Sequence, residues 1–62
     1  MQRFVCQPNT DGDFEIARWD EIKKQYVPIM NEVYSCNEEK KAKDRAQQLN
    51  KEYEEEIQLR KN

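Results

Sequence analysis

The sequence predicts an α+β fold, in which a small antiparallel three-stranded sheet packs against one long C-terminal helix in the order β-β-β-α. From Asn37 to Asn62, apolar residues recur every three or four positions, as they do on one face of a helix. Before Asn37, short runs of strand-forming residues alternate with clusters of turn-forming residues, as in a series of hairpins. We therefore expect residues 1–62 to form a single small domain, with the sheet over about 2–34 and the helix over about 37–61.

The first strand is expected from Gln2 to Gln7, where strand-forming residues are followed by Pro8. The next segment, 8–13, concentrates turn-forming residues. Within it, Asp11 followed by Gly12 is a strong hairpin signal, because glycine adopts positive φ without steric cost. A return strand should therefore follow.

The second strand, Phe14 to Trp19, has an ambiguous phase. If Phe14 and Ile16 face the core, strict alternation turns Arg18 inward and Trp19 outward. A bulge near Ala17 would correct the phase. Alternatively, Arg18 lies at the sheet margin with its stem over Trp19 and its charge in water. The sequence leaves both alternatives open.

The segment from Asp20 to Tyr26 is compatible with a turn or with a helix. The helical alternative comes from the spacing of the apolar residues Trp19, Ile22, Tyr26, Ile29 and Val33. Pro28 argues against it, because proline inside a helix costs about 3 kcal/mol. We therefore expect a polar turn over Glu21 to Lys24, followed by a third strand.

The third strand is expected from Gln25 to Met30, at an edge of the sheet where the missing N–H of Pro28 is not needed. Asn31 and Glu32 indicate a break. After the break, residues 33–34 should continue extended into the start of the helix.

The helix is predicted from a thin apolar seam and from residues that favour its start. The seam consists of Ala42, Ala46, Leu49, Tyr53 and Ile57. Ser35 or Asn37 can cap the first turn, and Ser35 followed by Glu38 fits a capping box. The expected core residues are Phe4, Ile16, Val27, Ile29 and Leu49, with Trp19 and Tyr53 part-buried.

This arrangement resembles small uncharacterised bacterial and phage proteins in which a β-meander is followed by a helix entered through a Ser-capped acidic turn. The runs that carry the resemblance are Phe14–Asp20, Tyr26–Ile29, Tyr34–Glu39 and Ala46–Asn50. It is a resemblance of layout over most of the chain. It implies the fold and a bacterial or phage origin, and it implies no activity and no site residues.

The composition argues against catalysis. The chain has no histidine and a single glycine, so it offers few activating bases and no glycine-rich phosphate loop. With Gly12 at the sixth position of a calcium loop, Gln7 and Arg18 would stand where carboxylates are required. Cys6 and Cys36 are expected to be reduced thiols. Without histidine they cannot by themselves complete a four-ligand zinc site, so a metal would need carboxylates or a second subunit. We expect no enzyme, no cofactor and no metal.

No apolar run approaches the length of a membrane span, and the first eight residues lack the apolar core of a signal peptide. We therefore expect a cytoplasmic protein that does not enter a membrane. The net charge of −2 disfavours non-specific binding to nucleic acid.

The geometry of the predicted elements suggests a protein-interaction module that forms a homodimer. A helix of about 24 residues extends ~36 Å, whereas a strand of about six residues spans ~20 Å. The far end of the helix should therefore overhang the sheet, with Tyr53 and Ile57 beyond their own core. The candidate interface is Leu49, Tyr53 and Ile57, and the expected partner is a second copy or another protein.

The alternative hypothesis is a nucleic-acid-binding module with a basic, aromatic sheet face. Its candidate residues are Arg18, Trp19, Lys23, Lys24 and Tyr26. Such faces stack single-stranded bases on aromatic rings and attract phosphates with basic side chains.

Overall fold

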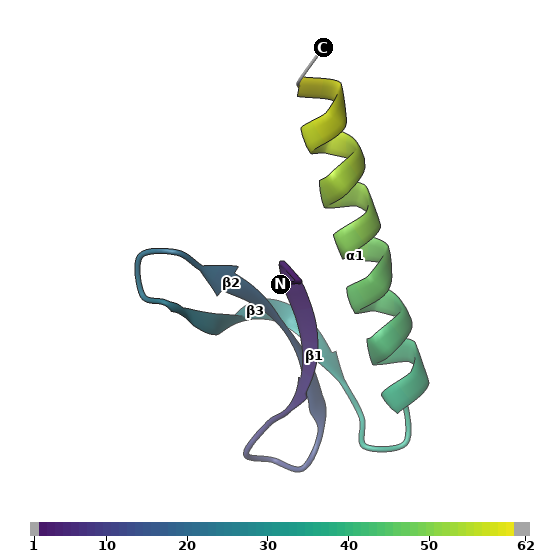
Figure 1. Cartoon of the computed structure of the whole chain (residues 1–62). Helices are drawn as coiled ribbons and strands as arrows, with labels where there is room; N and C mark the ends of the chain where they lie inside the picture. The colour runs from purple at the N-terminus through teal and green to yellow at the C-terminus, as the bar shows by residue number, and fades with distance from the viewer. Residues whose placement is uncertain (1, 61–62) are drawn as a thin grey trace.

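The computed structural model describes the backbone of residues 2–60 and the side chains of residues 2–59. It contains the strands β1 (Phe4–Pro8), β2 (Phe14–Asp20) and β3 (Gln25–Tyr34), followed by the helix α1 (Glu39–Arg60). The strands form one antiparallel sheet in the order β1-β2-β3 (Figure 1). The α+β fold is confirmed. The predicted end of the helix at Lys61 lies outside the described residues.

The loop between β1 and β2 is held by Asn9. Its side-chain oxygen Oδ1 accepts hydrogen bonds from the backbone N–H groups of Asp11 and Asp13, at 3.0 and 2.9 Å. Gly12 has a φ of 84°, in the left-handed region that glycine adopts without strain. The hairpin predicted from Asp11 and Gly12 is confirmed.

Strand β2 pairs without interruption along β1, so its side chains alternate strictly between the two faces of the sheet. Ile16 packs against α1 and defines the inner face, which Arg18 shares. Ala17 and Trp19 lie on the opposite, outer face. An irregularity does lie between Glu15 and Ala17, in the pairing with β3, but it leaves Trp19 on the outer face. Arg18 is exposed, as the other alternative expects, but it lies on the opposite face of the sheet from Trp19.

The segment between β2 and β3 is a turn, and the helical alternative is wrong. The carboxylate of Asp20 accepts hydrogen bonds from the backbone N–H groups of Ile22 and Lys23, at 2.8 and 3.0 Å. Lys24 then adopts a φ of 57° and donates its N–H to the carbonyl of Asp20. These bonds close the four-residue polar turn that the sequence predicts.

Strand β3 is longer than predicted, because it continues through the expected break at Asn31 and Glu32. The pairing with β2 is irregular there, since β3 uses more residues than β2 between the pairs Ala17 with Pro28 and Glu15 with Val33. Asn31 has a φ of 68°, which an asparagine tolerates better than most residues. The break is thus an irregularity inside one strand.

The helix begins at Glu39, two residues later than predicted. The backbone N–H of Ser35 donates to the Glu38 carboxylate at 3.1 Å, and the Ser35 hydroxyl donates to the same oxygen at 2.9 Å. The carbonyl of Glu38 accepts from the N–H of Ala42 at 3.1 Å, so Glu38 itself precedes the first helical turn. The predicted contact between Ser35 and Glu38 forms, in a turn outside the helix.

Helix α1 lies beside β1 on the inner face, and its C-terminal part extends past the sheet (Figure 1). Ile16 and Ala42 are fully buried and Ala46 nearly so, because the small alanines allow the helix to approach the sheet closely. Partly buried side chains surround this centre: Phe4, Cys6, Phe14, Ile29, Tyr34 and Leu49. Val27, expected in the core, is half-buried and lies outside this cluster.

Candidate protein interface

The edge of β1 is closed by a side chain of the helix. The N–H of Phe4 donates to Asn50 Oδ1 at 2.8 Å, and Asn50 Nδ2 donates to the carbonyl of Phe4 at 2.9 Å. The carbonyl of Arg3 accepts from the N–H of Trp19 in β2, so the backbone groups of Phe4 point away from β2. Asn50 therefore occupies the position that a further strand would need.

The rest of the β1 edge is also unsuited to strand addition. Cys6 is the next residue whose backbone groups point outward, and it lines a groove under α1 with Lys43 and Gln47. Pro8, which follows in the same alternation, has no N–H to donate.

The edge of β3 is interrupted in a different way. Because Val27 faces Arg18 of β2, the backbone groups of Pro28 point to the outside, where proline offers no N–H. A few residues later, the positive φ of Asn31 bends the strand. Neither edge of the described sheet presents a regular row of donors and acceptors, so a partner is expected to bind a face of the molecule.

The apolar seam of α1 contacts β1 as far along the helix as Tyr53, which is further than predicted. The ring of Tyr53 contacts the edge of the Phe4 ring, with centroids 6.4 Å apart and planes at 79°. The guanidinium of Arg3 lies over the Tyr53 ring, 5.3 Å from its centroid. The expectation that Tyr53 lies beyond its own core is therefore wrong, because Tyr53 packs on β1.

Of the three candidate interface residues, Leu49 and Tyr53 take part in the contact between helix and sheet. Ile57 lies one turn beyond Tyr53 on the same stripe and is half-buried. Leu59 is 77% exposed on the overhanging end of the helix. Ile57 is thus the predicted interface residue that lies beyond the contacts of Leu49 and Tyr53 with the sheet.

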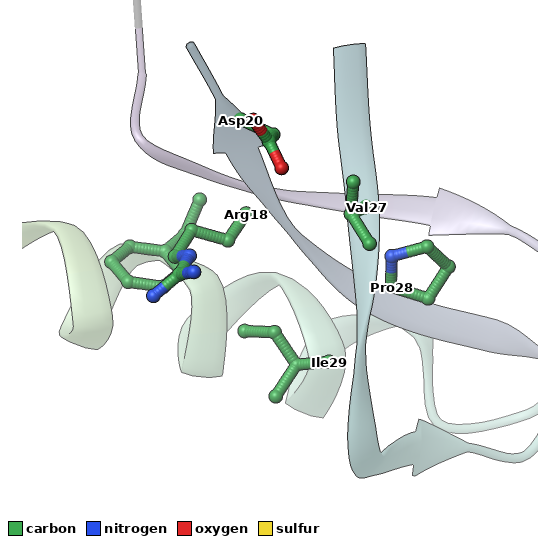
Figure 2. A pocket seen from close by; sticks show the side chains of 6 residues that line it. Arg18, Asp20, Val27, Pro28 and Ile29 are labelled. Carbon is green, nitrogen blue, oxygen red and sulfur yellow. The ribbon is translucent and has the colours of Figure 1, made fainter. Parts of the chain in front are cut away.

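A depression, here named the hollow, lies on the sheet where α1 does not cover it. Its volume is about 340 Å³, and it is lined by Phe4, Arg18, Asp20, Val27, Pro28 and Ile29. Figure 2 shows Arg18 and Asp20 on β2 and the three residues 27–29 on β3 around it. Apolar side chains therefore form most of the lining, with one cation and one anion beside them.

The two charges of the hollow differ in how they are engaged. The N–H of Lys23 lowers the pKa of the Asp20 carboxyl most, and the N–H of Ile22 and the positive charges of Lys23 and Arg18 lower it further. Asp20 is thus held by its own turn. Among the described residues, no carboxylate forms an ion pair with Arg18.

On the other side of the inner face, the guanidinium of Arg45 fixes the helix to β3. Its nitrogens bond the Glu32 carboxylate at 3.0 and 3.3 Å, and these bonds raise the pKa of Arg45. Arg45 and Glu32 satisfy one another, so they contribute to the position of α1 and are not open to a partner.

The hairpin of β2 and β3 carries exposed apolar side chains that were not among the predicted interface residues. Ile22 in the turn is 94% exposed, Met30 is 84% exposed and Val33 is 56% exposed. The sequence predicts Ile22 in a polar turn and Met30 at the end of a strand. At such positions a single apolar residue belongs to no helical or strand periodicity, so its exposure could not be predicted. These residues extend the apolar surface away from α1.

The five candidate nucleic-acid residues do not share a face. Trp19 and Tyr26 form an edge-to-face pair on the outer face, with centroids 5.0 Å apart and planes at 70°. Arg18 lies on the inner face, while Lys23 and Lys24 belong to the turn, where Lys24 pairs with Glu21 at 3.2 Å. The structure thus places the rings of Trp19 and Tyr26 on the opposite face of the sheet from Arg18.

In the described part of the chain, Cys6 and Cys36 are free thiols. Cys6 is half-buried, and burial raises the pKa of its thiol. Residues 2–60 contain no cluster of three metal-binding side chains. The one helix described there is not apolar enough to cross a membrane.

Comparisons with protein-family models, with curated proteins and with solved structures gave no match for this chain. The resemblance to bacterial and phage proteins of similar layout therefore stays a prediction. The hollow, the end of α1 and the interrupted sheet edges are the features of this molecule that bear on its function.

Proposed function

We propose that this chain is a non-catalytic, cytoplasmic protein-interaction module that forms a homodimer through the end of α1. The observation that carries the proposal is the apolar stripe of α1, which continues to Ile57 after Tyr53 has made the outermost ring contact with the described sheet. A second copy that covers this stripe also covers part of the sheet beside it.

The small size of the core supports association. Among the described residues, the only large side chain that is fully buried is Ile16, and its closest buried neighbours are alanines. Burying one large aliphatic side chain contributes about 1.5–3 kcal/mol, and domains of this size gain stability from oligomerisation. In a dimer each copy covers apolar side chains of the other, so more aliphatic side chains are buried although the chain is no longer.

The closed edges of the sheet support a helix-mediated contact. Strand addition needs a regular row of unpaired backbone groups along an edge, and Asn50 and Pro28 interrupt that row on the two edges. A face-to-face contact uses side chains, which this molecule offers on the exposed part of α1.

Sedimentation equilibrium of the wild type and of Ile57→Glu tests the proposal. The wild type is expected at about twice its 7.6 kDa monomer mass at micromolar concentration. Ile57→Glu is expected to remain monomeric, because a carboxylate at the centre of an apolar contact loses its hydration without gaining a partner. Tyr53 is left unchanged, since it also contacts β1 within one chain.

Leu59→Glu is the matched control, because it removes an exposed aliphatic side chain and adds the same charge two residues away, off the seam. It should still dimerise. Circular dichroism checks that both variants fold. A wild type that stays monomeric at hundreds of micromolar contradicts the proposal.

The nucleic-acid hypothesis retains one favourable observation, the ring pair of Trp19 and Tyr26 on a sheet face that α1 leaves uncovered. Titration with single-stranded DNA and RNA at low salt tests it through Trp19 fluorescence. Quenching at micromolar concentration would favour this function, and unchanged fluorescence at tens of micromolar would exclude it.

A further inference from the structure

We propose that the last part of α1, residues 50–60, is a strap that unwinds as a unit and so uncovers the start of β1 and the hollow beside it. The residues before the strap, 39–49, are named the anchored part, because they pack on the core. The inference goes beyond the proposed homodimer and does not depend on it.

The anchored part is fixed to the middle of the sheet. Ala42 and Ala46 are buried against Ile16. The guanidinium of Arg45 bonds the carboxylate of Glu32 on β3. Separating this part from the sheet would expose the core, so it requires unfolding of the whole molecule.

The strap is held by contacts at the start of β1. Asn50 bonds the N–H and the carbonyl of Phe4, at 2.8 and 2.9 Å. The ring of Tyr53 contacts the Phe4 ring and lies under the guanidinium of Arg3. None of residues 50–59 is buried. Segments with so few buried side chains open at a lower free energy than the core does.

The start of β1 is fixed to the sheet independently of α1. The carbonyl of Arg3 accepts a hydrogen bond from the N–H of Trp19 on β2, at 2.8 Å. The carbonyl of Gln2 accepts one from the hydroxyl of Tyr26 on β3, also at 2.8 Å. When the contact between strap and strand opens, the strap is therefore the part that moves.

The sequence of α1 favours unwinding over bending. Helices kink mostly at proline or glycine, and α1 contains neither. With the anchored part fixed, a straight helix keeps the strap on the sheet, so the strap leaves by unwinding towards Asn50. Four of the five positions 52–56 are glutamates, and like charges one turn apart, such as Glu52 and Glu55, weaken a helix.

Opening of the strap uncovers Phe4. Its backbone groups lose the amide of Asn50, and its ring loses Tyr53. Phe4 also lines the hollow, to which Val27 and Ile29 contribute apolar side chains (Figure 2). The open strap thus joins the hollow and the start of β1 into one larger apolar surface, so the strap controls the access of a partner to it.

Hydrogen exchange of the Phe4 amide, followed by NMR, tests the strap, because this N–H bonds Asn50. Glu55→Gly is compared with Glu55→Ala, at an exposed position of the strap. Glycine favours the unwound strap, so it should speed the exchange of Phe4 about fivefold relative to alanine. Position 55 lies five residues beyond Asn50, so the effect reaches Phe4 through the strap.

Asp44→Gly, compared with Asp44→Ala, is the matched control at an exposed position of the anchored part. Its glycine should speed the exchange of the Ala46 amide about fivefold. The exchange of Phe4 should stay unchanged, because the anchored part remains helical while the strap is open. Circular dichroism checks that all four variants fold.

The other outcomes overturn the inference. If Asp44→Gly speeds the exchange of Phe4, this amide exchanges by unfolding of the whole helix, and α1 has no separate strap. If Glu55→Gly leaves Phe4 unchanged, motion of the Asn50 side chain alone exposes its N–H. A wild-type Phe4 amide without protection would show that Asn50 does not hold β1. A monomeric wild type removes the proposed homodimer and leaves the strap in place.

Discussion

At the scale of single residues, Asn50 does for β1 what an additional strand would do. Its amide presents an oxygen acceptor and an N–H donor side by side, as a peptide group does, and Oδ1 and Nδ2 both bond the backbone of Phe4. The contact joins positions 46 residues apart and links the first strand to the middle of the helix. Asn50 therefore both positions α1 and closes the sheet edge.

Replacing Asn50 with alanine is expected to lower the free energy of unfolding by about 1–3 kcal/mol, because two part-buried hydrogen bonds are lost at about 0.5–1.5 kcal/mol each. Urea denaturation followed by circular dichroism measures the change. Gln47→Ala, at an exposed position one turn earlier, is the control and should be near neutral. Equal stability of the two variants would show that the two hydrogen bonds between Asn50 and Phe4, here named the clamp, contribute nothing.

At the scale of elements, the entry into α1 depends on a carboxylate outside the helix. The N–H and hydroxyl of Ser35 and the ammonium of Lys41 surround the Glu38 carboxylate. These groups lower the pKa of Glu38, with the backbone N–H of Ser35 as the largest cause. The turn before the helix is therefore most stable when Glu38 is ionised.

The lowered pKa of Glu38 predicts a pH-dependent contribution to stability. Because the folded-state pKa lies below the ordinary value of 4.5, the contribution is complete above pH 4.5 and is lost as the pH falls through the folded-state pKa. Glu38→Gln should therefore be less stable than the wild type near neutral pH, and the difference should shrink in acid. Urea midpoints across this range measure it.

The control for this pH dependence is Glu55→Gln, because the Glu55 side chain is exposed on the helix surface. Its difference from the wild type should stay small throughout the range. A Glu38→Gln difference that is constant from neutral to acid pH would contradict the assigned role of the carboxylate.

At the scale of the whole molecule, one sheet and one helix enclose a core with a single fully buried large side chain among the described residues. The molecule measures 42 × 25 × 19 Å, and its helix extends past the sheet (Figure 1). Much of its apolar surface lies on the hairpin of β2 and β3 and at the end of α1. Stability and association should therefore be linked.

This linkage predicts that thermal stability depends on protein concentration. If folded dimers unfold to separate chains, each tenfold increase in concentration adds about 1.4 kcal/mol to the apparent stability of the dimer. Calorimetric scans of the wild type over a hundredfold range should show a rising Tm. Ile57→Glu should show a constant Tm, and a constant Tm for the wild type would contradict the linkage.

The fold could be predicted because its signals are local. Asp11 and Gly12 specify a turn through the φ of glycine, and Pro28 indicates an edge through its missing N–H. The spacing from Ala42 to Ile57 specifies a helix and its buried side. Each of these signals acts within a few residues, so it does not depend on how the elements pack.

The site was harder to predict, because its features depend on how the elements cross. In the sequence, Asn50 is an ordinary polar residue next to the seam residue Leu49. Its role follows only from the packing of α1 on β1, which brings its amide within hydrogen-bond distance of the Phe4 backbone. The lengths of the helix and the strands predict that Tyr53 lies beyond the sheet, but α1 runs alongside β1, so Tyr53 contacts Phe4. The irregular pairing near Asn31 likewise depends on the register with β2.

The clamp between Asn50 and Phe4 also has a consequence for synthesis of the protein. A ribosome makes β1, β2 and β3 first, so the sheet can pair before the residue that covers its first edge has emerged. During this interval the nascent chain presents an open strand edge and an uncovered apolar face. A chain whose translation stops before residue 50 should therefore be the form most prone to aggregate in the cell.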